Sequence, residues 1–218
     1  SDATETILKL LPENPISDTK KSKIESIEPS CSGFVLLLGI DTKYEHLVHH
    51  NIFFSKDYEF EFEQIFEQKV MPDDPTIYIA NTSFSNPSHA PENGSNLFVL
   101  INAPYLSDKY DWNKKSPIYG EKIIRELEIR GLSNLGNHIK MQKTITPKDF
   151  YDKYLSNKGS IYGTSSNNRF SAFLRPRNKS RKIKGLYFVG GSTHPGGGIP
   201  LVVQSALNAV ELIERYEG

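Results

Sequence analysis

The chain has 218 residues, enough to bury a hydrophobic core, and its apolar and charged fractions are those of a folded protein rather than a disordered one. Its 26 lysines and arginines balance its 26 aspartates and glutamates, so no global field attracts nucleic acid. No apolar run approaches the ~18 residues of a membrane span, the polar start is no signal peptide, and the single cysteine, Cys31, allows no internal disulfide and fits a reducing compartment.

The first predicted elements are a short helix and a connector. Asp2 or Thr4 is placed to cap an apolar pattern that ends at Pro12, and residues 13–30 indicate a polar connector with few apolar anchors. The chain opens on Ser1, and a helix start with no strand before it suggests a piece of a longer protein. Removal of an initiator methionine is the alternative.

From residue 31 onward the pattern changes to strands. Residues 34–38 form a continuous apolar run of strand length, closed by a glycine. Residues 58–69 begin with an alternation but fit a helix better than a strand. The loop 83–96 is dense in turn residues and is predicted to join two antiparallel strands. Further strands are predicted over residues 51–54, 76–79 and 96–101.

The next stretch combines isolated helices with one more strand. An amphipathic helix is predicted over about residues 117–131, with proline at its start and glycine at its end. A strand over residues 138–145 and a short helix over residues 147–155 follow. The strands and helices do not alternate as βαβ units do, and this order predicts an α+β fold, with a mostly antiparallel sheet and flanking helices.

Three histidines lie close together in the segment EHLVHHN. On a helix, His46 would share a face with His49 and His50, a spacing that metal sites use. The segment leads directly into the predicted strand 51–54, and a strand would separate the three rings. We therefore expect surface or hydrogen-bonded histidines rather than a metal site.

A basic stretch without acids runs over residues 169–185. Aromatic residues interleave with its bases, a pattern that nucleic-acid binders share, but the neutral balance of the whole chain argues against a nucleic-acid partner. A solvated loop, a contact with anionic lipid headgroups and a contact with a cofactor phosphate stay open. The basic residues are Arg169, Arg175, Arg177, Lys179, Arg181, Lys182 and Lys184.

A glycine-rich loop separates a predicted strand, residues 186–189, from a helix pattern that opens at Pro200. Glycine lets the backbone approach a ligand closely, and the free N–H groups of a helix start favour an anionic group. The loop matches neither GxGxxG nor GxxxxGK[ST], so a tight turn without a ligand is the alternative. Its five glycines are Gly190, Gly191, Gly196, Gly197 and Gly198.

Residues 159–206 resemble the C-terminal region of bacterial phytoene-desaturase-type flavoproteins. This family includes carotenoid desaturases, such as the dehydrosqualene and diapophytoene desaturases, and related carotenoid oxygenases. The resemblance is carried by GSIYG, then FLRPRN, then GLYFVGGSTHPGGGIPLVVQSA, and it extends more loosely over residues 31–41 and the strands that follow. The run THPGGGIP before a helix with Ser205 and Ala206 is its most specific part.

The resemblance implies an FAD enzyme whose ADP-binding unit lies upstream, so that this chain is the C-terminal part. It implies a return segment from the FAD domain (1–14), a substrate-binding domain (15–183), and the last strand, loop and helix of an incomplete FAD-binding α/β domain (184–218). One departure is that Gly191 stands where plant-type relatives have an acid. In the family the loop contacts the flavin ring and ribityl chain, which points to Gly190, Gly191, Thr193, Gly198, Ile199 and Pro200.

The implied reaction is hydride abstraction from a long apolar polyene by oxidised FAD, at the membrane surface and in the cytoplasm. Desaturation is the first interpretation, with oxygenation on the same scaffold or a non-enzymatic lipid-binding module as alternatives. We predict no catalytic residue, expect His194 to fix the loop by hydrogen bonding, and expect residues 1–218 alone to lack FAD and activity. Five apolar residues line either a substrate tunnel or simply the core: Phe34, Leu36, Phe53, Phe98 and Leu100.

Overall fold

The computed structural model describes residues 1–11, 18–165 and 175–218, with the backbone alone for residues 18–20. Two compact units are present: unit 1 comprises Ser1–Ser32 and Asp149–Gly218, and unit 2 comprises Gly33–Lys148. The family-based boundaries after residues 14 and 183 stay a prediction. Some predictions fall on residues outside the described ranges, namely Pro12, Arg169 and the first two residues of FLRPRN.

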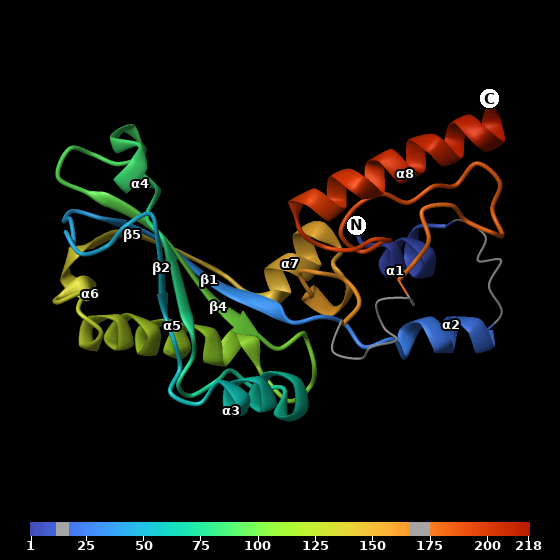
Figure 1. The fold of residues 1–218 in the computed structure, drawn as a ribbon. Coiled ribbons are helices and arrows are strands. Elements are labelled where there is room, and N and C mark those ends of the chain that lie inside the picture. The colour runs from blue at the N-terminus through green and yellow to red at the C-terminus, as the bar shows by residue number, and fades with distance from the viewer. Residues whose placement is uncertain (12–17, 166–174) are drawn as a thin grey trace. The chain divides into compact units, whose positions relative to one another are not determined.

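Unit 2 is built on a five-stranded sheet with the strand order β2-β3-β4-β1-β5 (Figure 1). The pairs β2–β3, β3–β4 and β1–β5 are antiparallel. This confirms the α+β class and the mostly antiparallel sheet, while the family-based assignment of the chain's end to a flavin domain stays a prediction. The strands are β1 Ser32–Ile40, β2 His50–Phe53, β3 Ile77–Ala80, β4 Ser95–Ala103 and β5 Ile139–Ile145.

The long helix α5, Trp112–Ile129, runs along one face of this sheet (Figure 1) and forms the core with it. The Phe34 and Tyr119 rings meet edge to face with their centroids 5.3 Å apart. The predicted start at Pro117 is wrong, because Asp111 caps the helix earlier by accepting from the N–H groups of the second and third helical residues at 3.1 and 3.3 Å.

Shorter helices complete unit 2. Helix α3, Tyr58–Glu63, continues into a π-helical turn, Gln64–Gln68, which confirms the helix predicted there. Between the antiparallel strands β3 and β4 the chain forms α4, Thr82–Ser85, and a 3-10 turn, Pro87–His89. Helix α6, Leu135–His138, leads directly into β5.

Unit 1 begins with α1, Ala3–Glu5, which is capped by Asp2 and continues into a π-helical turn, Thr6–Leu10. The connector prediction is wrong over part of its length, because residues Asp18–Glu25 form helix α2. The unit also contains most of α7, Pro147–Tyr154, a 3-10 turn, Asn157–Gly159, and the final helix α8, Ile199–Glu217.

The strand predicted over residues 186–189 is not a regular strand. Within this range only Tyr187 forms a β-bridge, to Lys179, among the residues that the structure describes. Two further hydrogen bonds tie the segment down: Ser180 N–H donates to the Leu186 carbonyl at 2.9 Å, and Phe188 N–H donates to the Asn178 carbonyl at 2.8 Å. The segment is therefore anchored to the basic stretch rather than to a sheet.

Candidate functional site

Two glycines of the loop in unit 1, Gly197 and Gly196, are closely packed against side chains of the protein itself, and a third, Gly191, is in ordinary contact. A Cβ at Gly197 would lie 2.8 Å from Cδ1 of Tyr162, and a Cβ at Gly196 would lie 3.2 Å from Nε of Arg175. A Cβ at Gly191 would lie 3.4 Å from the Cα of Gly197. Part of the loop's glycine content therefore serves tight internal packing, as the ligand-free alternative expects.

Two other glycines of the loop have a different environment. Gly190 and Gly198 have φ values of 124° and 96°, which L side chains rarely adopt. A Cβ at either position would meet no atom of the described residues within 4 Å. Internal packing therefore does not explain these two glycines, and the space beside them is available to a ligand.

Helix α8 starts without a side-chain cap. Its N-cap residue is Gly198, and Pro200 in the first turn has no N–H to satisfy. Ile199 is 83% exposed, so the helix start is accessible. The N–H groups of the first turn and the positive end of a 19-residue helix thus lie directly after the two glycines with open space beside them.

Arg175 holds the loop from the inside. Its Nη1 donates to the carbonyl oxygens of Tyr162 and Gly191, both at 3.0 Å, and its Nη2 donates to the carbonyl of Thr164 at 3.3 Å. Burial lowers the pKa of this guanidinium. One side chain therefore joins the segment GSIYG to the glycine loop, two of the stretches that carry the family resemblance.

A buried hydrogen-bond network fixes the other end of the loop. Asn178 Nδ2 donates to Ser205 Oγ at 2.8 Å and to the Phe188 carbonyl at 3.0 Å. Ser205 Oγ accepts from the N–H of Gly190 at 3.2 Å. Thr193 Oγ1 donates to the Gly190 carbonyl at 2.9 Å and lies 3.0 Å from Ser205 Oγ. This network sets the conformation at Gly190.

The predicted site residues therefore fall into two groups. Gly198, Ile199 and Pro200 are exposed at the helix start, and Gly190 has open space beside it. Thr193, 1% exposed, is turned inward, and the carbonyl of Gly191 is occupied by Arg175. All six lie on one loop, but their contact with a cofactor stays a prediction.

The prediction that His194 fixes the loop by hydrogen bonding is confirmed for its backbone N–H. Its ring is exposed and forms no hydrogen bond to any residue that the structure describes, although its backbone N–H donates to the Pro176 carbonyl at 2.9 Å. Sequence reasoning missed the side chains that fix the loop, namely those of Arg175, Asn178 and Ser205. The available signal was their presence in the stretches FLRPRN and QSA, which resemble the family as strongly as the glycines do.

Unit 2 offers a second candidate surface, the open sheet face, on the side of the sheet opposite α5. Ile52, Tyr78 and Leu100 are aligned across β2, β3 and β4 by the strand register. Ile52 is 54% exposed. The apolar part of the open sheet face consists of Leu37, Ile52, Tyr78, Phe98, Leu100 and Met141, and the register places the exposed Lys143, opposite Leu37, and His50 on the same face.

The predicted tunnel residues divide between the two faces. Phe34 and Leu36 are fully buried against α5, and Phe53 packs against the same core. Phe98, 36% exposed, and the half-buried Leu100 lie on the open sheet face. The core interpretation is thus confirmed for the first three residues, and a substrate contact remains a proposal only for the last two.

A groove of about 540 Å³ lies where the open sheet face meets the loop before β4. Gly39 of β1 and Met141 of β5 form its floor, and the register places them opposite each other. The loop from His89 to Asn96 forms its wall. An elongated apolar molecule lying along the open sheet face would have room to extend into this groove.

The histidines form hydrogen bonds rather than a metal site. His49 Nδ1 lies 2.6 Å from Ser85 Oγ, and His50 Nδ1 lies 2.7 Å from Tyr78 Oη, while His46 is exposed. Over residues 1–11, 18–165 and 175–218, no group of three potential metal ligands occurs. The expectation of surface or hydrogen-bonded histidines is confirmed.

The described part of the basic stretch lines a depression of about 680 Å³ in unit 1. Arg177 and Arg181 are exposed there, and Lys179 lies with its Nζ 3.7 Å from the ring centroid of Tyr216. Arg175, by contrast, is committed to the loop. The accessible basic cluster therefore starts at Arg177. Among the described helices, none combines the length and apolarity needed to cross a bilayer.

The chain is similar in sequence to known proteins. No protein-family model matches the chain. It is 37% identical over 202 residues to the 4,4'-diaponeurosporene oxygenase of Staphylococcus haemolyticus (strain JCSC1435), which covers 92% of this chain and 40% of that protein. The protein of the same name from Staphylococcus aureus (strain MSSA476) is 38% identical over 202 residues, with 92% of this chain and 41% of that protein covered. The chain thus spans about two fifths of the length of these relatives.

Among solved structures, an oxidoreductase from Methanosarcina mazei aligns with a TM-score of 0.45 and 15% identity over 90% of this chain and 38% of that chain. The matched 202 residues of the curated relatives include both the glycine loop and the open sheet face.

Proposed function

We propose that this relative of the 4,4'-diaponeurosporene oxygenases acts as part of an FAD-dependent oxidoreductase that oxidises a long carotenoid polyene. The observation that carries the proposal is 37% to 38% identity to these curated enzymes over 92% of the chain. It agrees with the resemblance to carotenoid desaturases and oxygenases found in the sequence. The polyene, the flavin and the activity of the whole protein belong to the proposal.

The glycine loop fits one edge of a flavin. Gly190 and Gly198 leave space beside the backbone, and the uncapped start of α8 offers N–H groups at Ile199 and Leu201. A reduced flavin gathers negative charge, and the positive end of a helix stabilises such charge. FAD, when bound, supplies the two-electron oxidation of a substrate C–H bond. This chain contributes the backbone donors, with Pro200 fixing the helix start.

In this proposal Arg175 and the Asn178–Ser205 pair support the loop and do not contact the ligand themselves. They do not point to the open space beside Gly190 and Gly198; they hold the loop carbonyls and amides in place. A loop fixed in advance loses little entropy when a cofactor binds, so these residues are positioning residues in the proposal.

The open sheet face supplies the apolar surface for the substrate. Ile52, Phe98 and Leu100 present aliphatic and aromatic surface without charge, as contact with a hydrocarbon chain requires. Holding one bond of the polyene at a fixed place is the protein's main contribution to such a reaction.

Two reactions fit the proposed scaffold. Sequence analysis put desaturation first, but the names of the curated relatives favour oxygenation, which becomes the primary proposal. Desaturation of a phytoene-type or dehydrosqualene-type precursor is the second candidate. A non-enzymatic lipid-binding module is the third.

We also propose that the protein works at the cytoplasmic surface of a membrane, because carotenoids partition into bilayers. Arg177, Lys179, Arg181 and Lys182 form an accessible basic cluster, and each such base near an anionic surface contributes roughly 1 kcal/mol to attachment. The chain as a whole is formally neutral, so the proposal depends on this local cluster and not on the net charge.

The test uses the complete product of the gene that encodes this chain, expressed in bacteria that accumulate 4,4'-diaponeurosporene. Pigments are extracted and resolved by liquid chromatography with mass spectrometry. Oxygen-containing products support oxygenation, and products that have lost hydrogen pairs without gaining oxygen establish desaturation instead. Unchanged pigment from a folded protein, together with unchanged phytoene and dehydrosqualene in parallel strains, contradicts both enzymatic proposals.

A further inference from the structure

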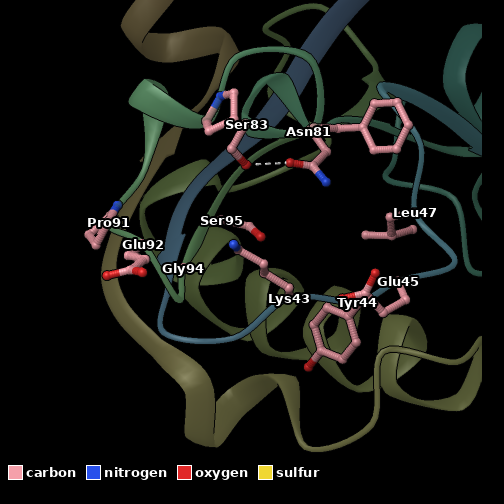
Figure 2. A pocket seen from close by; sticks show the side chains of 12 residues that line it. Lys43, Tyr44, Glu45, Leu47, Asn81, Ser83, Pro91, Glu92, Gly94 and Ser95 are labelled. Carbon is pink, nitrogen blue, oxygen red and sulfur yellow. Dashed lines mark hydrogen bonds between the residues drawn. The ribbon is translucent and has the colours of Figure 1, made fainter.

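A pocket of about 350 Å³ in unit 2 is not used by the proposed function. It lies between the loop after β1, the end of β3, helix α4 and the start of β4 (Figure 2). Four residues line both this pocket and the groove beside the open sheet face: Pro91, Glu92, Gly94 and Ser95. The opposite wall of the pocket is formed by Lys43, Leu47 and Asn81.

Asn81 is the buried polar group of this pocket. It is 6% exposed, and its backbone N–H donates to the His49 carbonyl at 2.8 Å. Its side-chain Oδ1 accepts from Ser83 Oγ at 2.6 Å, which fixes the orientation of the amide. The amide nitrogen then points into the pocket (Figure 2), where it forms no hydrogen bond with the residues that the structure describes. This nitrogen is accessible from the pocket and is therefore a donor available to a ligand.

Lys43 supplies a charge to the same pocket. Its side chain extends into the pocket (Figure 2), and within residues 1–11, 18–165 and 175–218 its ammonium forms no ion pair. Glu45 and Glu92 are exposed at the rim and lie beyond ion-pair distance of this ammonium. Ser95 Oγ donates to the Thr42 carbonyl at 3.1 Å, so its proton is already used.

We propose that this pocket binds a small-molecule carboxylate. In this proposal one carboxylate oxygen accepts from the Asn81 amide and the other from the Lys43 ammonium, because both donors line the same pocket and one of them is charged. The exposed acids at the rim, Glu45 and Glu92, disfavour multiply charged anions such as phosphate. The pocket's volume suits an acid of a few carbon atoms.

The inference is independent of the flavin and polyene proposals, since neither uses Asn81 or Lys43. The test is a nuclear magnetic resonance titration of residues 1–218, which follows the side-chain amide signal of Asn81. Acetate and succinate are the probes, and acetamide is the uncharged probe of matched shape, all at constant ionic strength. The Asn81 signal is assigned by its loss in Asn81→Asp.

Acetate should shift the Asn81 amide signal saturably, with weak binding of order 1 mM; the doubly charged succinate should bind more weakly, and acetamide should not bind. Lys43→Gln should weaken binding about tenfold, as expected for the loss of a charge-assisted hydrogen bond. Asn81→Asp keeps the acceptor for Ser83 but replaces the amide donor, so binding measured on neighbouring backbone signals should disappear. Lys56→Gln, an exposed lysine outside the pocket, should bind like the unmodified chain.

Three outcomes would overturn the proposal. An Asn81 amide signal that no carboxylate shifts would leave the pocket without the proposed ligand. Equal shifts with acetamide would show that charge has no part in recognition. Equal weakening by Lys43→Gln and Lys56→Gln would assign the effect to overall charge rather than to this pocket.

Discussion

Arg175 Nη1 donates a 3.0 Å hydrogen bond to the carbonyl of Gly191, so a guanidinium from the basic stretch holds the backbone of the glycine loop. The same group also reaches the carbonyls of Tyr162 and Thr164. The charged side chain of Arg175 thus fixes the shape of the loop, and the exposed residues of the loop take no part in these hydrogen bonds. Arg175 belongs to the structure of the site rather than to the basic surface.

Replacing Arg175 should therefore loosen the loop. Arg175→Met leaves three carbonyls without their charged donor, and we expect the free energy of unfolding to fall by about 3 kcal/mol. The free energy of unfolding of Arg175→Lys should lie between that of the unmodified chain and that of Arg175→Met, because an ammonium lacks the planar fork that bridges separate carbonyls. Urea unfolding measures the loss, and faster amide hydrogen exchange at Gly190 locates it. Arg177→Met, an exposed neighbour, serves as control, and an equal loss there would contradict the assignment.

The two faces of the sheet should respond differently to truncation. Leu36 is fully buried beside α5, so Leu36→Ala should cost about 2 to 5 kcal/mol of stability. Phe98 is 36% exposed on the open sheet face, so Phe98→Ala should cost about 1 kcal/mol or less. In the complete gene product, Phe98→Ala should instead raise the KM for the polyene. An unchanged KM would remove the open sheet face from the substrate site.

Alkaline pH should destabilise unit 2 through its buried tyrosines. Burial raises the pKa of Tyr110 from 10.0 to about 12, and the pKa of Tyr119 is also raised by burial. Between about pH 10 and 12 the unfolded chain loses these protons while the folded chain keeps them. Stability therefore falls as pH rises through that window, by up to about 1.4 kcal/mol per pH unit for each group.

Tyr110→Phe should make this decline with pH shallower. The measurement is the free energy of urea unfolding at several values between about pH 9 and 11. Tyr58→Phe, which removes a hydroxyl from a side chain that is 53% exposed, is the control. A decline as steep in Tyr110→Phe as in the control would contradict the account.

Membrane attachment should depend on the accessible basic cluster. Replacing Arg177, Arg181 and Lys182 by Glu should reduce flotation of the protein with anionic liposomes, since each base contributes about 1 kcal/mol near such a surface. The control replaces Lys114, Arg125 and Lys143, which are exposed on unit 2, and changes the net charge equally. Equal losses from both triple variants would show that net charge alone, rather than this cluster, governs attachment.

The sequence predicted the sheet well because its strands are short apolar runs between turn residues. It misplaced the start of α5 because proline is typical of the first turn of a helix, whereas Pro117 lies inside this helix, beyond the first turn that follows the cap at Asp111, and removes one backbone hydrogen bond there. It also predicted a strand at 186–189, but an apolar pattern does not show whether a strand has a partner, and Val189 is 53% exposed.

The candidate site was predicted in part. Glycine clustering and the helix start located the loop correctly, since both are local properties of the sequence. The inward roles of Arg175 and Asn178 depend on carbonyls and hydroxyls distant in sequence, such as Tyr162 and Ser205, which no local pattern reveals. The division of glycines into packed and open ones likewise requires the folded chain.

The flavin content of the complete gene product tests the central claim most directly. Gly198 and Gly185 both have positive φ, 96° and 71°, and an added Cβ at either meets nothing within 4 Å in residues 1–11, 18–165 and 175–218. Gly198→Val and Gly185→Val both place a side chain on a backbone with positive φ, but only the first fills the space beside the start of α8. We expect FAD in the unmodified protein and in Gly185→Val, and its loss in a folded Gly198→Val protein. A protein without flavin, or equal flavin in both variants, would contradict the account.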